Sequence, residues 1–384
     1  MIVLQFFIFI LALFVFVFSA YLCFLTFGAW IFKKITSQST MPLSMAIVIP
    51  VHNEESMIKA TLDSISLSEY QLSIVDTFVI ADNCSDATVE VAKNNGAHVF
   101  ERRDPENQGK GQALDWFFRK HETIYENFEA VVVLDAETVV DKHFLSQISS
   151  SLSNLEVEVV QGFYGVANPE ASWRTRLSTA ALNVSHYVRP AGRNAFGGSA
   201  GLKGNGMAFK PNILKRYNWP SSAVVEDHEF STKLLLNDKI VHYNPEAIVL
   251  SEMSEKRGQA EEQGWGCEVA RFQIIINYGL DLLKIFFRKK RFLYFDGFME
   301  LFIPSLTILF AAQITLLFLS CLFFHALIFD SILCLILTIF CVLSGMILCK
   351  ASFSIWLALL GSPLYILWKL VCYTKSGCFQ KAKQ

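Results

Sequence analysis

Residues 130–137 read Ala-Val-Val-Val-Leu-Asp-Ala-Glu, an apolar run that ends in two acids separated by one residue. A continuous apolar run of this length predicts a strand buried on both faces, as in a parallel sheet covered by helices. Asp135 and Glu137 are two residues apart on an extended chain and so point to the same side. Such a pair can hold one hard divalent cation, whereas a solvated strand end is the alternative interpretation.

Two earlier segments have the same form. Met45–Val51 ends in an acidic cluster at Glu54, and Ile74–Ile80 ends in another at Asp82. Between these strands we expect helices at Ser56–Ser66, Ala87–Asn95 and Gly111–His121, and one further strand at His98–Glu101. This alternation predicts an α/β fold with a parallel, doubly wound sheet. Ligands of such sheets bind at the carboxyl ends of the strands, although Asp86 is equally interpreted as a helix N-cap.

Two further segments carry candidate chemistry. Residues 107–111 read Asn-Gln-Gly-Lys-Gly before a helix, where backbone N–H groups and Lys110 can meet a phosphate. This segment is not a P-loop, and no Gly-x-Gly-x-x-Gly pattern follows a strand, which disfavours a dinucleotide oxidoreductase. Residues 224–229 read Val-Val-Glu-Asp-His-Glu and open a predicted helix at Phe230–Leu236. A carboxylate of this segment can deprotonate an acceptor hydroxyl. The alternative is a purely structural role, in which the acids of the first turn pair with the helix dipole.

Overall composition narrows the protein class. The chain has 384 residues, of which 53% are hydrophobic and 18% charged, with a net charge of −2. These values exclude a disordered chain, and the near-neutral charge gives no support for a nucleic-acid partner. The nine cysteines include no Cys-x-x-Cys pair, so we expect neither a zinc site nor a disulfide framework.

The charge distribution predicts a soluble domain between membrane segments. Residues 1–32 carry no charge and are long enough to span a bilayer, and the missing charged n-region argues against a cleaved signal peptide. Lys33 and Lys34 follow this run and predict a cytoplasmic central domain, because positive charge favours the inner side. We expect two further spans at Leu301–Phe324 and Leu327–Leu348.

Two apolar segments keep alternatives open. Phe353–Tyr373 is either a third C-terminal span or a re-entrant hairpin, because Gly361 to Pro363 interrupt it. Phe272–Phe287 is either an amphipathic helix on the inner leaflet or an ordinary packing helix. The predicted organisation is an N-terminal transmembrane helix (residues 1–32), a cytoplasmic domain (33–271), an amphipathic interfacial region (272–300), a C-terminal transmembrane region (301–374) and a tail (375–384).

Taken together, these segments resemble the membrane-embedded members of glycosyltransferase family 2, in the cellulose and hyaluronan synthase-like superfamily. The resemblance covers residues 45–270 and rests on six short motifs: Ile49–Glu55, Ala81–Asn83, Gly109–Gly111, Asp135–Glu137, Gly204–Gly206 and Glu226–Asp227. It implies a GT-A fold, an inverting hexosyl- or N-acetylhexosaminyl-transferase activity, and a multi-pass protein of the bacterial inner membrane.

The resemblance also implies residue roles. Asp135 and Glu137 take the place of the Asp-x-Asp motif that binds Mg²⁺ or Mn²⁺, and Asp227, next to Glu226, takes the place of the general base. The implied nucleotide-sugar-binding residues are Pro50, Val51, Asn53, Glu54, Asp82, Lys110, Asp135 and Ala136. Those implied on the acceptor or diphosphate side are Lys203, Gly204, Asn205, Gly206 and Trp265.

One departure from the family pattern affects the expected activity. Processive relatives carry Gln-x-x-Arg-Trp, whereas residues 261–265 here read Glu-Glu-Gln-Gly-Trp, without the motif's Gln and Arg. This loss puts processive synthesis in doubt. Four arginines before the Glu-Asp motif are candidate ligands of a lipid phosphate, or else part of a solvated face: Arg174, Arg176, Arg189 and Arg193.

Three functions compete on this evidence. The first is transfer of a sugar from a nucleotide sugar, expected to be a UDP-sugar, to a lipid, lipid-linked or polysaccharide acceptor. The second is a catalytically weak nucleotide-sugar-binding scaffold in an envelope glycan assembly complex. The third, a transporter or channel, is disfavoured because the predicted spans carry almost no charge.

Overall fold

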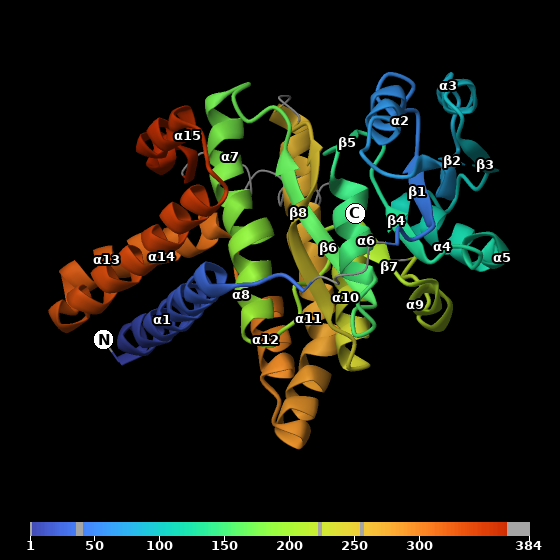
Figure 1. The fold of residues 1–384 in the computed structure, drawn as a ribbon. Coiled ribbons are helices and arrows are strands. Elements are labelled where there is room, and N and C mark those ends of the chain that lie inside the picture. Colours follow the sequence, from blue (N-terminus) through green and yellow to red (C-terminus); the bar gives the residue numbers. More distant parts are fainter. Residues whose placement is uncertain (1, 36–40, 222–224, 254–256, 367–384) are drawn as a thin grey trace.

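A computed structural model describes residues 2–35, 41–221, 225–253 and 257–366 of the chain, and excludes the side chains of residues 2, 3 and 257–270. Figure 1 shows the arrangement of its helices and strands. The strands are β1 Met45–Val51, β2 Val75–Asp82, β3 His98–Arg102, β4 Ala130–Val133, β5 Thr138–Val140, β6 Val159–Val166, β7 Met207–Phe209 and β8 Val241–Ser251.

The helices of the soluble part are α2 Ile58–Ser66, η1 Leu72–Ile74, α3 Thr88–Asn94, α4 Lys110–Lys120, α5 Glu122–Tyr125, α6 Phe144–Leu152, α7 Trp173–Asn183, η2 Val184–Val188, α8 Arg189–Ala195, α9 Pro211–Arg216 and α10 Glu226–Leu236. The remaining helices are α1 Ile2–Ile31, α11 Arg257–Lys289, α12 Phe292–Phe302, α13 Leu306–Phe323, η3 His325–Leu327, α14 Ile328–Leu348, α15 Phe353–Ala358 and η4 Leu359–Gly361.

The strands form one mixed sheet in the order β3-β2-β1-β4-β7-β6-β8-β5. The first four strands are mutually parallel, and β7 is inserted antiparallel between β4 and β6. In the register, Val51 lies opposite Ala81 and Val48 opposite Val133, so β1, β2 and β4 end at the same edge. The predicted α/β fold with a mainly parallel sheet is confirmed, and the expected strands lie within two residues of their predicted bounds.

Two hydrophobic cores cover the two faces of the sheet. Alternate residues of β1 point to opposite sides, so that Val48 packs with Phe117 of α4 while Ile49 packs with Leu62 of α2 and Phe144 of α6. The first core continues into α1, α8 and α14. The face of the sheet that carries Val48 is therefore the one whose core is continuous with the apolar helices.

Three helices among the described residues are long and apolar enough to cross a membrane: Leu4–Ile31, Leu306–Phe323 and His325–Leu348. In Figure 1 these helices, α1, α13 and α14, project together from α7 and α8, away from strands β1–β3. Gly28 and Gly192 allow α1 and α8 to touch backbone to backbone, because a Cβ on Gly192 would lie 2.0 Å from Leu25 O.

The predicted start of the first C-terminal span was wrong. Leu301 and Phe302 belong to α12, and the membrane-length helix begins only at Leu306. Pro304 causes the break: it lacks an N–H and holds the preceding Ile303 in an extended conformation, with φ −62° and ψ 120°. The intervening residues 303–305 are not helical.

The predicted helix Phe272–Phe287 forms the second half of α11. One side of this half is exposed at Phe272, Ile276 and Leu280, while Ile274 and Leu282 are buried against α10 and α12. Of the segment predicted at Phe353–Tyr373, residues 353–366 form an interrupted apolar helix shorter than a span. Residues 367–384, which include the rest of that segment, lie outside the described chain.

Candidate active site

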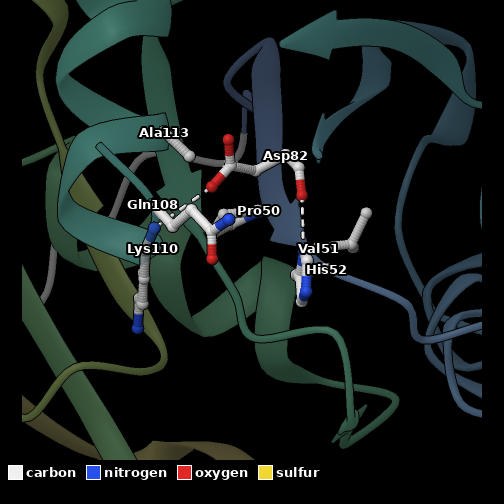
Figure 2. Close-up of a pocket in the computed structure, with 8 residues that line it drawn as sticks. Pro50, Val51, His52, Asp82, Gln108, Lys110 and Ala113 are labelled. Atoms are coloured by element: carbon white, nitrogen blue, oxygen red, sulfur yellow. Dashed lines mark hydrogen bonds between the residues drawn. The ribbon is translucent and has the colours of Figure 1, made fainter. Parts of the chain in front are cut away.

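The ends of β1 and β2 form one wall of a cavity of about 270 Å³ (Figure 2). Asp82, the last residue of β2, is 3% exposed, and its carboxylate accepts hydrogen bonds from Arg102 at 2.5 Å and from Gly109 N–H at 3.1 Å. His52 Nδ1–H donates to Asp82 O at 2.7 Å. These bonds join three separate loops around the cavity, whose lining is Pro50, Val51, His52, Asp82, Gln108, Gly109, Lys110 and Ala113.

Asn53 and Glu54 do not line this cavity. Asn53 has φ 55°, and its Oδ1 accepts Ser85 N–H at 2.8 Å, while Glu54 N–H donates to Thr88 Oγ1 at 2.8 Å. Both residues thus fasten the end of β1 to the loop after β2. Asp86 accepts Thr88 N–H at 3.0 Å, but Ala87 occupies the N-cap position of α3, so the interpretation of Asp86 as the N-cap was wrong by one residue.

Lys110 connects three chain segments on the other side of the cavity. Its Nζ lies 2.5 Å from Asp135 Oδ1 and donates to Gly204 O at 2.5 Å. Burial alone would lower the pKa of Lys110, but the carboxylates of Asp135 and Glu226 outweigh burial and raise it. Lys110 therefore stays charged and holds the end of β4 against the loop before β7.

Hydrogen bonds to neighbouring segments fix the backbone around Asp135. Asn205 is fully buried, and its Oδ1 accepts Asp135 N–H at 3.2 Å, while Ala136 O accepts the Thr61 hydroxyl at 2.6 Å. The carbonyl of Gly206 accepts a hydrogen bond from the N–H of residue 162 on β6. Ala136, Asn205 and Gly206 thus support the loop after β4 and do not line the cavity bordered by Asp82.

Asp135 and Glu137, the predicted metal ligands, offer the carboxylate oxygens that a hard divalent cation prefers. Burial, followed by the charges of Asp135 and Glu54, raises the pKa of Glu137, because neighbouring carboxylates repel one another. A bound Mg²⁺ or Mn²⁺ would relieve this repulsion. Within the described chain no group of three or more metal-ligating side chains occurs, so phosphate oxygens of a ligand would have to complete the shell.

Glu226 and Asp227 occupy the first turn of α10, which begins four residues earlier than predicted. Gly111 allows this turn to approach α4 closely, because a Cβ there would lie 3.1 Å from Pro220 O and 3.3 Å from Glu226 Cβ. A Cβ on Gly204 would make an ordinary contact of 3.4 Å with Asp227 Oδ2. Burial raises the pKa of Glu226 to about 7, and the Asp227 charge adds to this rise. Gly204 thus lies beside Asp227 while its carbonyl binds Lys110.

A second cavity, of about 490 Å³, extends from this turn toward the helices of membrane length. Lys203, Glu226 and Asp227 line one part of it, whereas Leu22 of α1 and residues 303–307 line another. Asp82 borders the first cavity and Asp227 the second, and Lys110, bound to Asp135 and Gly204, stands between them. The side chain of Trp265, expected on the acceptor side, lies outside the described residues.

Sequence reasoning missed two residues of the second cavity, Glu300 and His186. Glu300 Oε2 accepts a hydrogen bond from Arg189 Nε–H at 3.3 Å, and Glu300 Oε1 forms ion pairs with Arg189 Nη2 at 2.6 Å and with Lys203 Nζ at 3.5 Å. Asp296 and Glu300 are acids spaced i, i+4 in the otherwise apolar α12, which was the available signal. His186 lies in η2, a π-helical turn between α7 and α8, and no sequence pattern marks it.

The interpretation of Arg193 as a ligand of a lipid phosphate was wrong, as was the solvated alternative. Arg193 is buried, and its Nε donates to Asp296 Oδ2 at 2.8 Å, while Tyr21 of α1 donates to Asp296 Oδ1 at 2.7 Å. Arg176 pairs with Glu170 at 3.5 Å. Of the four arginines, Arg189 is the one that lines the second cavity.

Comparisons with known proteins show which family this chain matches and which proteins it is similar to. A family model described as glycosyltransferase like family 2 matches residues 42–264. The chain is 25% identical over 223 residues to a probable glycosyltransferase, YdaM, of Bacillus subtilis, a match that covers 55% of the chain and 51% of the relative. It is 26% identical over 210 residues to a poly-beta-1,6-N-acetyl-D-glucosamine synthase of Staphylococcus epidermidis, covering 53% of the chain and 48% of that relative.

The chain therefore spans about half the length of the curated relatives it matches. Among solved structures, it is similar to the mannosyltransferase PcManGT of Pyrobaculum calidifontis in complex with GDP-Man and Mn²⁺. The TM-score is 0.51 at 14% identity, and the match covers 94% of this chain and 96% of the other. At this identity the likeness concerns the fold, and it confirms the predicted GT-A class.

Proposed function

Because the chain belongs to the glycosyltransferase like family 2, we propose that it transfers a sugar from a nucleotide-sugar donor, expected to be a UDP-sugar, to a lipid or glycan acceptor at the membrane. The observation that carries this proposal is the position of Lys110. It lines the cavity bordered by Asp82, and it binds both Asp135 and the carbonyl of Gly204, which adjoins Asp227.

The two cavities divide the substrates between them. The smaller one offers a buried carboxylate, backbone N–H groups and apolar surface, a combination that suits a nucleoside. A donor bound there would extend its diphosphate past Lys110 toward Asp135 and Glu137. The larger cavity, with Asp227 on its wall, then receives the acceptor.

In the proposed reaction, the acceptor hydroxyl attacks the anomeric carbon from the face opposite the diphosphate. The new C–O bond forms as the bond to the phosphate oxygen breaks, and the electron pair leaves with the nucleoside diphosphate. Asp227 accepts the hydroxyl proton, and Lys110 offers a positive charge near the leaving group. The product has the inverted configuration, and no covalent enzyme intermediate is required.

Asp135 and Glu137 are the residues that would hold Mg²⁺ or Mn²⁺. When bound, the cation would neutralise negative charge on the departing diphosphate. Lys110, which pairs with Asp135, and Gly204 provide the remaining support on this side of the site.

We place the catalytic domain on the cytoplasmic side of a multi-pass membrane protein. The support is the basic cluster Arg288–Arg291, at the end of α11 and ahead of α13, together with Lys33 and Lys34 after α1. Nucleotide sugars in the cytoplasm would then reach the cavity lined by Asp82.

The decisive experiment is a donor screen of the purified full chain in lipid nanodiscs, with mass spectrometry of the products. We expect transfer from one nucleotide sugar with Mg²⁺ or Mn²⁺. In Asp227→Asn, turnover should fall by about 10²–10⁴-fold while donor binding, measured by calorimetry, persists. Asp135→Ala should lose metal-dependent donor binding.

The matched control is Asp115→Asn, which removes a carboxylate that pairs with Arg119 on α4 and lines neither cavity. Full activity in Asp227→Asn would remove that residue from the base role. Donor binding without turnover of any nucleotide sugar by the wild-type chain would favour the scaffold function instead.

A further inference from the structure

The larger cavity combines a charged and an apolar part. Its charged part contains the acids of the α10 turn and the cations Arg189, Lys203 and Arg271. Its apolar part is formed by Leu22 of α1 and by the segment that links α12 to α13. One space of about 490 Å³ therefore joins the proposed catalytic base to helices of membrane length.

The break between α12 and α13 is part of the cavity wall. Ile303 and Ser305 are extended on either side of Pro304, with ψ 120° and 149°. Non-helical backbone beside membrane helices is tolerated where it borders a cavity or protein. Ser305 Oγ is also buried without a hydrogen-bond partner among the described residues, which leaves a polar group available beside the apolar wall.

The cations on the cavity wall gather around one carboxylate. Arg189 and Lys203 both approach the same oxygen of Glu300, at 2.6 and 3.5 Å. Arg271, which lines the same cavity, donates its Nε–H to the carbonyl of Leu301. The side chains of Lys203 and Glu300 are 6% and 9% exposed, so water screens this cluster poorly.

The groups around Lys203 leave the cluster positively charged. Burial lowers the pKa of Lys203 to about 8, a fall that Glu300 and Asp227 oppose and that Arg189 and Arg193 increase. The positive charge of the cluster follows from its composition, because three cations, Arg189, Lys203 and Arg271, lie on the wall with the one carboxylate of Glu300. His186 adds no charge, because burial and Lys203 lower its pKa to about 3. The other carboxylates on the wall are those of the α10 turn, where Asp227 has a separate proposed role.

We propose that this cavity binds an amphiphilic acceptor that carries a phosphate between a hydroxyl-bearing headgroup and a hydrocarbon chain. Arg189, Lys203 and Arg271 would hold the phosphate, with the hydroxyl directed toward Asp227. The hydrocarbon chain would lie along Leu22 and the segment at Pro304. This inference rests on the proposed function, since it specifies the acceptor of the same transfer.

Binding of matched amphiphiles tests the proposal without requiring turnover. The purified full chain in detergent is titrated with farnesyl phosphate, with farnesol and with inorganic phosphate, and binding is followed by native mass spectrometry. We expect farnesyl phosphate to bind at least about tenfold more tightly than either of the other two, a difference of about 1.4 kcal/mol. Equal binding of farnesyl phosphate and farnesol would overturn the phosphate assignment.

Charge-removing variants locate the phosphate. Lys203→Gln and Arg271→Gln should each abolish the advantage of farnesyl phosphate over farnesol, and Lys203→Arg should restore it. The control Arg216→Gln removes an exposed arginine on α9 and should keep the wild-type preference. Thermal unfolding of every variant shows that it is folded, and an unchanged preference in both folded Gln variants would refute the assignment.

A competition experiment separates the acceptor phosphate from the donor diphosphate. Saturating UDP with Mn²⁺ should leave farnesyl phosphate binding intact if the two ligands occupy separate cavities. Displacement of farnesyl phosphate by UDP would instead assign these cations to the donor and overturn the proposal. Absence of UDP binding with retained farnesyl phosphate binding would contradict the proposed function while sustaining the lipid site.

Discussion

The ammonium group of Lys110 lies 2.5 Å from the carboxylate of Asp135, and this contact joins the first turn of α4 to the loop after β4. The same ammonium group reaches Gly204 O, on the loop that lies beside Asp227. One side chain therefore fixes the spacing of the segments that carry the proposed metal ligands and the proposed base.

Replacing Lys110 by Met should weaken donor binding by about tenfold, equivalent to about 1.4 kcal/mol, because the diphosphate would lose a nearby positive charge. The measurement is calorimetric titration with UDP in the presence of Mn²⁺. Lys120→Met is the matched control, since Lys120 is an exposed residue at the other end of the same helix. Equal affinities of both variants would show that Lys110 does not contact the donor.

Gly204→Ala should lower kcat by filling space beside the proposed base, where the acceptor hydroxyl would approach: the new methyl group would make an ordinary contact of 3.4 Å with Asp227 Oδ2. Gly96 provides a close control: both glycines have φ +83°, but a Cβ on Gly96 meets nothing within 4 Å. Each alanine should therefore cost about 1 kcal/mol of stability through backbone strain. A similar loss of kcat in both folded variants would argue against the specific effect at Asp227.

Arg102→Met should destabilise the fold by about 3–5 kcal/mol, because it leaves the buried carboxylate of Asp82 without its cation. Arg102 and Asp82 have side chains that are 5% and 4% exposed. In contrast, Lys59→Met breaks an exposed pair with Asp63 and should cost less than about 1 kcal/mol. Thermal unfolding of the two variants measures the difference, and equal melting temperatures would contradict it.

The buried carboxyl of Glu226 should make stability depend on pH. Its pKa is about 7 in the folded chain, above the value of 4.5 from which burial raises it. The folded state then binds more protons than the unfolded state between these values, so stability should fall as pH rises from about 4.5 to about 7.

Glu226→Gln should flatten this part of the profile of melting temperature against pH. Glu106→Gln, at an exposed residue, is the control and should leave the wild-type slope unchanged. A slope that persists in Glu226→Gln would assign the titration to another group.

The part of the site that depends on parallel strands was predictable from sequence. Apolar runs that end in Asp82 and Asp135 predict that both acids meet at one edge, because the carboxyl ends of parallel strands do so, and the register confirms this. The position of Glu226 and Asp227 next to a helix start was also recognisable. The remaining site residues were predicted from the family resemblance, which rests on the order of the six motifs.

Contacts between distant segments were not predictable. Glu300 pairs with Arg189 and Lys203, which lie about a hundred residues earlier in the chain, and no local periodicity encodes such a pairing. Pro304 was visible in the sequence, but the high hydrophobicity on both sides of it favoured a continuous span. The antiparallel insertion of β7 likewise depends on tertiary packing, since its three residues carry little pattern of their own.

If the apolar helices cross a bilayer as proposed, the contacts of α1 determine how the proposed catalytic domain sits relative to it. Tyr21 donates to Asp296, and Gly28 and Gly192 bring α1 against α8 without intervening side chains. A membrane helix held in this way would fix the height and tilt of the proposed catalytic domain, whereas a helix joined only through a flexible linker would not. A version truncated for solubility at residue 33 would therefore lose part of its own hydrophobic core along with a helix of membrane length.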